Sequence, residues 1–562
     1  MTSIDAPNRD GTRSDADMTV AHLLARRLAE AGVEVVFGVP GEDCQGLLEA
    51  IDARPDLTFV ATRHEGAAAM MAEAHGKLTG SMGCCLATSS VGAVNLLSGV
   101  NVADHDSTPL VVLVGQVDAA TRGRGGWQEC DILGLFRPFC RNVTELDNPA
   151  RADHDLWRAV NAARAARPGP VLVAVPRDCQ DLPAPRTAPT LRSLIRPGPA
   201  AVDIAAATRL LGDAERPVLI AGGGVRAAGA TAELTAFAER LGAPVLTAFR
   251  RTDAVDNRHP AYVGALSHNP GPIVLECLAE ADVFAVIGSR MTGITAQRYQ
   301  FPRDDQRVVH IDIDGAGLAT SWLGAEVAIH SDARCALEEL TRALPVRGAP
   351  PAPWWTSWTA DRSGHRQRSA ATREQQIIVR VAEVLDTLLP SDAVLSCDAG
   401  DFSIAAGPAI AVGGGRRYLG STSGSMGYGI PAAIAAKRVW PDRVCVALCG
   451  DGGAMMTIQE LETAKRLDAG IVVVVFNNNG YGSIRRHQDR RPGGRRVGTE
   501  LTNPDFAALA RLFGFRGHLI VRPDDIPRVW QAVRDEPMAG HVIEVDIPTA
   551  PVPHQRTAPG EE

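Results

Sequence analysis

The sequence predicts an α/β fold of three consecutive α/β domains with mainly parallel sheets. Short apolar runs typical of buried strands alternate with segments of helical apolar spacing, which is the pattern of parallel strands joined by crossover helices. Residues 183–200 are rich in Pro, Ala and Arg, and residues 345–371 contain Pro-Pro-Ala-Pro and a charged run, so both are predicted to be linkers. The 562 residues exceed what one core usually holds, since domains average roughly 150 residues.

The first domain, residues 19–182, follows a polar start, residues 1–18, that we expect to be disordered. Helical apolar spacing begins at Thr19, and the alanine-rich stretch Ala67–Leu78 predicts another helix. Strands are expected at 35–37, 57–61, 83–88, 109–114 and 169–176, and further helices at 47–51 and after the small-residue turn 89–93.

The second domain, residues 201–344, and the third, residues 372–549, repeat the alternation. A strand that ends in Gly222-Gly223-Gly224 opens the second domain. The third domain begins with a helix at Gln375–Leu389 and a strand at Ala393–Ser396, and a polar tail, residues 550–562, follows it. Other strands of the second domain are expected at 283–287 and 308–313.

Composition and charge exclude several classes of protein. The chain is 45% apolar and 22% charged, as in globular proteins, and its net charge of −8 argues against a general nucleic-acid binder. The eleven cysteines show no CxxC or Cys/His ligand spacing, so we interpret them as reduced thiols. No signal-peptide core and no run near the ~20 residues of a membrane span is present. We therefore expect a cytoplasmic protein with neither nucleic acid nor membrane as a partner.

The most informative stretch is Arg443–His487, which is predicted to be a strand–helix–strand unit. Two apolar runs, Val444–Leu448 and Ile471–Phe476, flank a helix expected from about Met455 to Leu467. The first run ends in Gly-Asp-Gly-Gly and the second in Asn-Asn-Asn-Gly. Because the carboxyl ends of neighbouring parallel strands lie side by side, both turns should border one ligand site.

Asp451 in the first turn and Asn478 in the second would each offer a hard oxygen to one ion. The glycines would let backbone N–H groups approach a phosphate, so the pair predicts a Mg²⁺-diphosphate site. Taken alone, Gly-Asp-Gly-Gly could equally be a tight turn. Glu65 also follows a strand and precedes a helix, which places it at the carboxyl edge of the first sheet; a carboxylate at the helix N-terminus is the alternative interpretation.

These motifs resemble those of the thiamine-diphosphate (ThDP) enzymes, in the superfamily of 2-oxo acid decarboxylases and acetohydroxyacid (acetolactate) synthases. Segments 63–80 and 86–117 are similar to the pyrimidine-binding domain, and the turns after 448 and 476 are similar to the diphosphate motif. The resemblance runs from about residue 20 to 545. It implies a pyrimidine-binding domain, a middle domain of nucleotide-binding type and a diphosphate-binding domain, in that order.

The resemblance also implies the cofactor's contacts. Glu65 would hydrogen-bond the pyrimidine ring, so that the imino tautomer removes the thiazolium C2 proton. The Gly-Ser-Met-Gly-Tyr-Gly segment supplies Gly424, whose carbonyl would receive the 4′-amino group, and Met426, which would prop the bent cofactor; otherwise Met426 is simply a buried methionine. The Mg²⁺ ligands would be Asp451, Asn478 and Gly480, and the other cofactor-binding candidates are Gly400, Asp401, Gly450, Gly452, Gly453 and Tyr481.

In that family the pyrimidine and diphosphate domains of one site come from different subunits, so the resemblance implies a homodimer or homotetramer. It also implies that a 2-oxo acid is decarboxylated. The activated aldehyde then either attacks an acceptor carbonyl, as in acetolactate synthases, or is released, as in a nonoxidative decarboxylase or an acyl-CoA lyase. A non-catalytic relative that has kept the fold is a third alternative, against which Glu65, Asp451 and Asn478 argue.

Among family members the synthases are most similar, with informative departures. Residues 127–131, Trp-Gln-Glu-Cys-Asp, resemble the synthase segment that would place Gln128 beside the thiazolium; a surface polar residue is the alternative. Where synthases carry an apolar residue and a tryptophan that select the second 2-oxo acid, this chain has Ser483 and His487. That difference puts branched-chain acetohydroxyacid synthesis in doubt and suggests a more polar acceptor or none.

Glu42 stands where pyruvate decarboxylase carries a catalytic aspartate, and as a proton donor it would favour simple decarboxylation. The paired histidines that accompany that aspartate are missing between Gly115 and Gln128, so an exposed loop carboxylate is the alternative.

The middle domain of the synthases binds FAD with an arginine that matches Arg290, and Asp312 and Asp314 resemble their strand end. Residues 267–270, Ser-His-Asn-Pro, replace the synthases' histidine-glycine segment. FAD is therefore a candidate cofactor, and a structural vestige is the alternative. The basic run 485–496 lacks interleaved aromatic residues, so we interpret it as a solvated loop or one that draws anionic substrates to the site.

Overall fold

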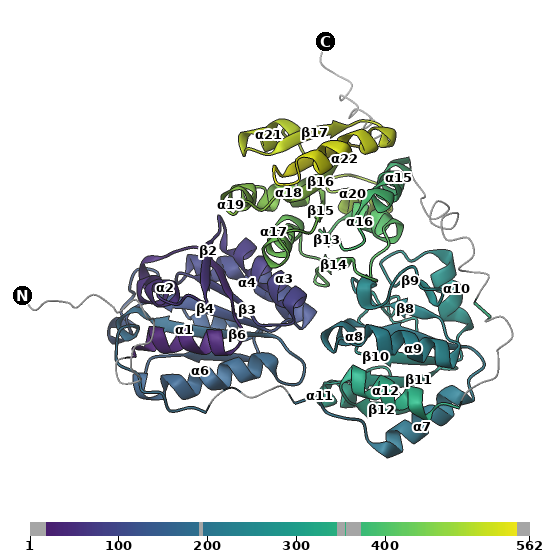
Figure 1. Ribbon diagram of the computed structural model, residues 1–562, viewed down its shortest axis with the longest axis horizontal. Coiled ribbons are helices and arrows are strands. Elements are labelled where there is room, and N and C mark those ends of the chain that lie inside the picture. The colour runs from purple at the N-terminus through teal and green to yellow at the C-terminus, as the bar shows by residue number, and fades with distance from the viewer. Residues whose placement is uncertain (1–17, 190, 192–194, 346–353, 356–372, 548–562) are drawn as a thin grey trace, which may run out of the picture.

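The computed structural model describes residues 18–189, 191, 195–345, 354–355 and 373–547 (Figure 1). These residues form three α/β domains, each built on a six-stranded sheet, and every strand pair within the sheets is parallel, which confirms the predicted fold class. The start, the tail and most of the second predicted linker lie outside the described residues. Within the described ranges, no helix has both the length and the apolar character that crossing a membrane requires.

The first domain, purple to blue in Figure 1, has the strand order β2-β1-β3-β4-β6-β5. Alternate residues of β3 belong to two different cores, Cys84 to one and Cys85 to the other, because both faces of a parallel sheet are covered by helices. Its strands are β1 Val35–Gly38, β2 Thr58–Ala61, β3 Gly83–Ala87, β4 Leu110–Gln116, β5 Asn142–Glu145 and β6 Pro170–Pro176. Its helices are α1 Val20–Glu30, α2 Gln45–Asp52, α3 Glu65–Thr79, α4 Val91–Asp106, α5 Ile132–Phe136 and α6 Pro149–Arg164.

The middle domain has the order β12-β11-β10-β7-β8-β9, so the strand order reverses between β7 and β10, where open α/β sheets bind nucleotides. Its strands are β7 Pro217–Ala221, β8 Val245–Thr247, β9 Tyr262–Ala265, β10 Val283–Ile287, β11 Arg307–Asp312 and β12 Val327–His330. Its helices are α7 Ala201–Gly212, α8 Gly223–Ala227, α9 Thr231–Leu241, α10 Pro272–Glu280, α11 Gly315–Ala319 and α12 Ala333–Ala343.

The third domain repeats the topology of the first, with the order β14-β13-β15-β16-β18-β17. Its strands are β13 Val394–Cys397, β14 Arg417–Gly420, β15 Cys445–Gly450, β16 Val472–Asn477, β17 Arg516–Ile520 and β18 His541–Asp546. Its helices are α15 Arg373–Leu388, α16 Asp401–Ala406, α17 Gly429–Val439, α18 Asp451–Thr457, α19 Glu460–Arg466, α20 Gly482–Asp489, α21 Phe506–Leu512 and α22 Ile526–Asp535.

The prediction of a single helix from Met455 to Leu467 is wrong in detail. The chain forms two helices, α18 and α19, and α18 begins at Asp451, directly after β15. Between them the N–H of Leu461 bonds the carbonyl of Ile458 at 3.1 Å, an i→i+3 bond that tightens the turn and divides the helix.

A buried charge network joins the three domains at the last residue of α4, Asp106. Its carboxylate accepts hydrogen bonds from Lys77 Nζ of α3 at 2.5 Å and from the Thr422 N–H of the third domain at 2.9 Å. It also pairs with Arg251 of the middle domain at 2.9 Å. Burial alone would raise the pKa of Asp106, but Arg251 and Lys77 outweigh it and hold the pKa below its usual range. The charged carboxylate therefore stabilises the junction at neutral pH.

Replacing Asp106 with Asn is expected to lower the free energy of unfolding by about 3 kcal/mol, because the buried pair of Arg251 would be broken and Lys77 would keep only its pair with Glu73. Urea unfolding of Asp106→Asn at neutral pH measures the loss. Asp147→Asn, at an exposed carboxylate, is the control and should change stability by no more than about 0.5 kcal/mol. Because the pKa of Asp106 is depressed in the folded protein, the stability difference between the unmodified protein and Asp106→Asn should narrow as the pH falls below the ordinary carboxyl range. Equal stability of the two variants would contradict the prediction.

Candidate active site

A cavity of about 510 Å³ lies at the carboxyl edge of the third sheet, against the middle domain. The middle domain contributes Phe249, Arg250, His268, Asn269 and Arg298 to its walls. The third-domain residues predicted from the sequence all line it: Gly400, Asp401, Gly424, Met426, Gly450, Asp451, Gly452, Gly453, Asn478, Gly480, Tyr481 and His487.

The two polar turns meet as the strand pairing predicts. Gly450 at the end of β15 lies opposite Phe476 of β16, so Asp451 and Asn478 come to the same edge. Asp451 is 3% exposed, and its Oδ2 accepts hydrogen bonds from Gly480 N at 3.0 Å and Asn503 Nδ2 at 2.7 Å. Burial raises the pKa of Asp451 despite these bonds. A cation beside it would offset the burial of the charge.

Asn478 presents an orphaned oxygen to this edge. Its Oδ1 is buried and has no hydrogen-bond partner among the described residues, which is costly unless a ligand satisfies it. One carboxylate, one amide oxygen and a backbone carbonyl at Gly480 are the hard oxygen donors that Mg²⁺ prefers. In the described part of the chain no group of three or more His, Cys, Asp and Glu side chains gathers as a metal site, and this donor set does not require one.

The turn that contains Met426 is organised by a carboxylate that the sequence analysis did not identify. Asp398, which follows β13, is fully buried and accepts hydrogen bonds from Gly427 N at 2.9 Å and Ala399 N at 2.7 Å. Burial raises the pKa of Asp398 to about 6. Asp398 also packs closely on Gly453, since a Cβ there would stand 2.6 Å from its Oδ2. One buried carboxylate thus ties the turn of Met426 to the turn of Asp451.

Tyr481 and Met426 close over Gly452. A Cβ on Gly452 would lie 2.7 Å from the Tyr481 ring and 3.4 Å from the Met426 Cε, so only glycine allows this approach. Both predicted cofactor contacts therefore lie against the Gly-Asp-Gly-Gly turn.

Glu65 lies apart from this cavity, in the first domain. It is the first residue of α3, and the cap before it is His64, whose Nδ1 accepts a hydrogen bond from Gly66 N at 3.0 Å. The half-buried Glu65 accepts one from Asn95 Nδ2 of α4 at 3.0 Å. Glu65 is not among the residues that line the cavity of Asp451 within the same chain.

Gln128 and Glu42 are not brought into the cavity either. Gln128 sits in a loop with a left-handed backbone, φ 62°, beside the exposed Trp127. The Glu42 side chain is 76% exposed and lies 3.5 Å from Arg177. Its neighbour Asp43 is buried instead and accepts hydrogen bonds from the Thr88 hydroxyl at 2.6 Å and the Ser89 N–H at 2.9 Å. In a single chain Glu42 thus has the geometry of a loop carboxylate.

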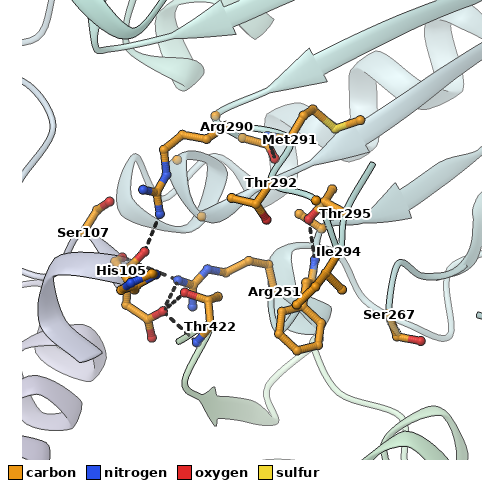
Figure 2. Close-up of a pocket in the computed structure, with 18 of the residues that line it drawn as sticks. His105, Ser107, Arg251, Ser267, Arg290, Met291, Thr292, Ile294, Thr295 and Thr422 are labelled. Carbon is orange, nitrogen blue, oxygen red and sulfur yellow. Dashed lines mark hydrogen bonds and ion pairs between the residues drawn. The ribbon is translucent and has the colours of Figure 1, made fainter. Parts of the chain in front are cut away.

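A second cavity, of about 800 Å³, opens where the strand order of the middle domain reverses (Figure 2). Arg290 reaches across it and donates to the carbonyl of His105 at 2.5 Å, and Arg251 points toward Thr422 beside the three-domain junction. Asp312 lines the same cavity, and burial raises its pKa. Gly222 is needed for packing, because a Cβ there would stand 2.1 Å from the Gly288 oxygen.

The sequence analysis missed two residues that support the candidate site from outside the cavity lining. Asn503, in the loop before α21, holds the Asp451 carboxylate, and Asp398 holds the turn of Met426. Asp398 follows an apolar strand, as Asp451 does, and this was the signal that could have found it. Asn503 follows no such pattern.

Comparisons with known proteins cover nearly the whole chain. Family models match at residues 18–135, the N-terminal TPP binding domain of thiamine pyrophosphate enzymes, at 204–340, their central domain, and at 398–545, their C-terminal TPP binding domain. An acetolactate synthase isozyme 3 large subunit of Escherichia coli is 30% identical over 541 residues, 94% of each chain. A probable acetolactate synthase large subunit of Methanococcus aeolicus is 30% identical over 534 residues, 91% of this chain and 89% of the relative.

Proposed function

Because this chain belongs to the thiamine pyrophosphate enzymes and is acetolactate synthase-like over most of its length, we propose that it uses ThDP and Mg²⁺ to decarboxylate a 2-oxo acid and transfer the activated aldehyde to an acceptor carbonyl. The observation that carries the proposal is the buried Asp451 beside the unsatisfied oxygen of Asn478. With pyruvate in both roles, two pyruvates and one proton would give one acetolactate and one CO₂. Release of the aldehyde, by a decarboxylase or an acyl-CoA lyase, is the alternative.

The chain's own residues would divide the work at the cofactor. ThDP, when bound, supplies a carbon nucleophile and an electron sink for the departing CO₂. Asp451, Asn478 and the Gly480 carbonyl would hold Mg²⁺ on the diphosphate, and Gly424 and Met426 would orient the pyrimidine and thiazolium rings. Glu65 would hold a proton at the pyrimidine ring.

Three further residues would act on the substrate. Gln128 would face the thiazolium, and His487 would face the acceptor from α20. Glu42 would donate a proton to the product in the aldehyde-releasing alternative, which requires that its exposed loop meet a second subunit.

We propose a homodimer or homotetramer with active sites between subunits, and the absence of Glu65 from the cavity of Asp451 in the single chain supports it. Exposed apolar side chains occur beside both halves of the proposed site, Val91 and Val94 next to Glu65, and Met455 and Met456 next to Asp451. Pairing these surfaces between two copies would bury them and complete the site. The eleven cysteines form no disulfide, which fits a cytoplasmic location.

The cavity of the middle domain would take FAD. Its volume suits a nucleotide, Arg290 supplies positive charge, and Asp312 at the end of β11 stands where such folds contact a ribose hydroxyl. The flavin colour of the purified protein would distinguish bound FAD from a vestigial cavity.

Incubation with pyruvate, ThDP and Mg²⁺ is expected to yield acetolactate, with one CO₂ released for every two pyruvates consumed. Product analysis by mass spectrometry measures the partition, and omission of ThDP is the control. Acetaldehyde as the main product, at one CO₂ per pyruvate, would favour the aldehyde-releasing alternative. Calorimetry that detects no ThDP binding in the presence of Mg²⁺ would favour a non-catalytic relative.

A further inference from the structure

Arginine and histidine side chains from two domains gather at the mouth of the active-site cavity. Arg298 and His268 of the middle domain and His487 and Arg490 of the third domain line it. Among the described residues, the Arg298 guanidinium has no hydrogen bond or ion pair. The lining carboxylate Asp401 is already paired with Arg486. Glu374 and Asp451 also line the cavity, and among the described residues neither makes an ion pair with Arg298.

Arg298 of the middle domain and His487 of the third domain both lie near enough to His268 to affect its titration. The pKa of His268 is lowered, first by burial and then by the positive charges of Arg250, Arg298 and His487. The lowered pKa leaves His268 neutral near pH 7, so the charges that a bound anion would offset are those of the arginines, Arg298 and Arg490. Arg250 is not available for this, because it donates to the carbonyls of Cys397 at 3.1 Å and Asp398 at 3.0 Å.

Arg298 is held at the mouth by an unusual backbone. Gln297, Arg298 and Tyr299 have φ angles of 50°, 60° and 63°, and consecutive left-handed conformations are rare for residues other than glycine. The side chain of Gln297 fixes this turn by donating to the Ser267 carbonyl at 3.0 Å and the Ile294 carbonyl at 2.7 Å. Strain that the surrounding structure maintains in this way is typical of functional sites.

The cluster is separate from the diphosphate edge. Helix α20 begins at Gly482, just after the Gly480 that borders the proposed metal site. At about 1.5 Å per residue, His487 lies about 7 Å further along the helix. Arg298 is therefore placed to bind a second anion at this end of the cavity, beyond the diphosphate.

We propose that the acceptor carries a second anionic group, a carboxylate or phosphate remote from the reacting carbonyl, and that Arg298 binds it together with His487 and Arg490. The assignment rests on the proposed function and names the substrate class of that site. A guanidinium suits either group, because its fork of N–H donors matches two oxygens at once. Arg298 is thereby a specificity-determining residue for the acceptor, and His487 would contact the same anionic group.

Calorimetry on the protein loaded with ThDP and Mg²⁺ tests the charge preference with unreactive anions. Glutarate, with two carboxylates, should bind on the order of tenfold more tightly than butyrate, the scale of one charge-assisted hydrogen bond. Arg298→Gln should abolish this ratio, Arg298→Lys should keep part of it, and Arg534→Gln on α22, far from the cavity, should keep all of it. An equal affinity of the unmodified protein for both anions would overturn the proposal.

Turnover with pyruvate as donor then compares acceptors in matched pairs. We expect the KM for 2-oxoglutarate to be lower than that for 2-oxobutyrate, or the KM for glyceraldehyde 3-phosphate to be lower than that for glyceraldehyde, and the pair that responds identifies carboxylate or phosphate. In Arg298→Gln the affected KM should rise on the order of tenfold.

The two proposals fail in different ways. Arg298→Gln could lose ThDP or a bound nucleotide while the ratio of its affinities for glutarate and butyrate stays unchanged. This result would assign the arginine to cofactor binding and overturn the acceptor proposal. Absence of CO₂ release from any 2-oxo acid in the ThDP-loaded protein would instead overturn the proposed function, while the calorimetric ratio would still decide the charge preference of Arg298.

Discussion

Replacing Glu65 with Gln is expected to reduce turnover on the order of a thousandfold or more, the range of a lost proton-transfer catalyst, while the protein keeps its ThDP. The amide preserves the size of the side chain and can still accept the hydrogen bond from Asn95. It cannot share a proton with the pyrimidine ring as a carboxylate does. The loss should therefore fall on kcat, because the residues proposed to hold the diphosphate line the cavity of the third domain.

The direct readout for Glu65→Gln is exchange of the C2 proton of bound ThDP into deuterated water, followed by NMR after acid quench. This exchange should slow in parallel with kcat. Calorimetry should show ThDP affinity within a few-fold of the unmodified protein. Glu49→Gln, at an exposed glutamate of α2 in the same domain, is the matched control and should leave both rates unchanged. Full turnover of Glu65→Gln on the true substrate would show that the role is wrongly assigned.

How far the sequence predicts the site depends on where each residue lies along its strand. Asp451 and Asn478 were predictable because each follows an apolar run, and parallel pairing brings the two strand ends together. Asn503 was not, because it reaches Asp451 from a loop whose path is set only by tertiary packing. Arg298 was missed for a related reason. Its position depends on left-handed backbone angles that no residue pattern in Gln-Arg-Tyr indicates.

Local structure shows the same division. Central strands such as β4 and β16 were predictable because runs of Val, Ile and Leu buried on both faces leave little alternative. Edge strands such as β5 and β17 were not predicted, because they lack such a run. The break between α18 and α19 was not, because Ile458 and Gln459 are compatible with a continuous helix. The Thr457 hydroxyl donates to the Gly427 carbonyl at 3.0 Å, which anchors the end of α18 to the turn that contains Met426. The position of that break therefore depends on a contact from a distant segment.

Replacing Asp451 with Asn is expected to weaken Mg²⁺-dependent ThDP binding on the order of a hundredfold or more, since the variant removes the only carboxylate of the proposed ligand set. The fold should survive. Burial raises the pKa of Asp451, so its charged form destabilises the cofactor-free protein near neutral pH, and a neutral amide removes that penalty. Thermal unfolding should therefore give an unchanged or higher midpoint without cofactor, and lose the increase that ThDP and Mg²⁺ produce in the unmodified protein. Asp442→Asn, at an exposed residue just before β15, is the control.

Mixing the two inactive variants tests whether Glu65 and Asp451 meet across subunits. In a symmetric dimer, a chain with Glu65→Gln paired with a chain with Asp451→Asn has one site with both defects and one site with neither. Equal mixing makes half of the dimers mixed, so about a quarter of the unmodified activity should return after dissociation and reassembly. If both residues served the same site from one chain, every site would keep a defect and no activity would return. Recovered activity would place Glu65 at the cavity of Asp451 only after dimerisation, in agreement with its absence from that cavity in the single chain.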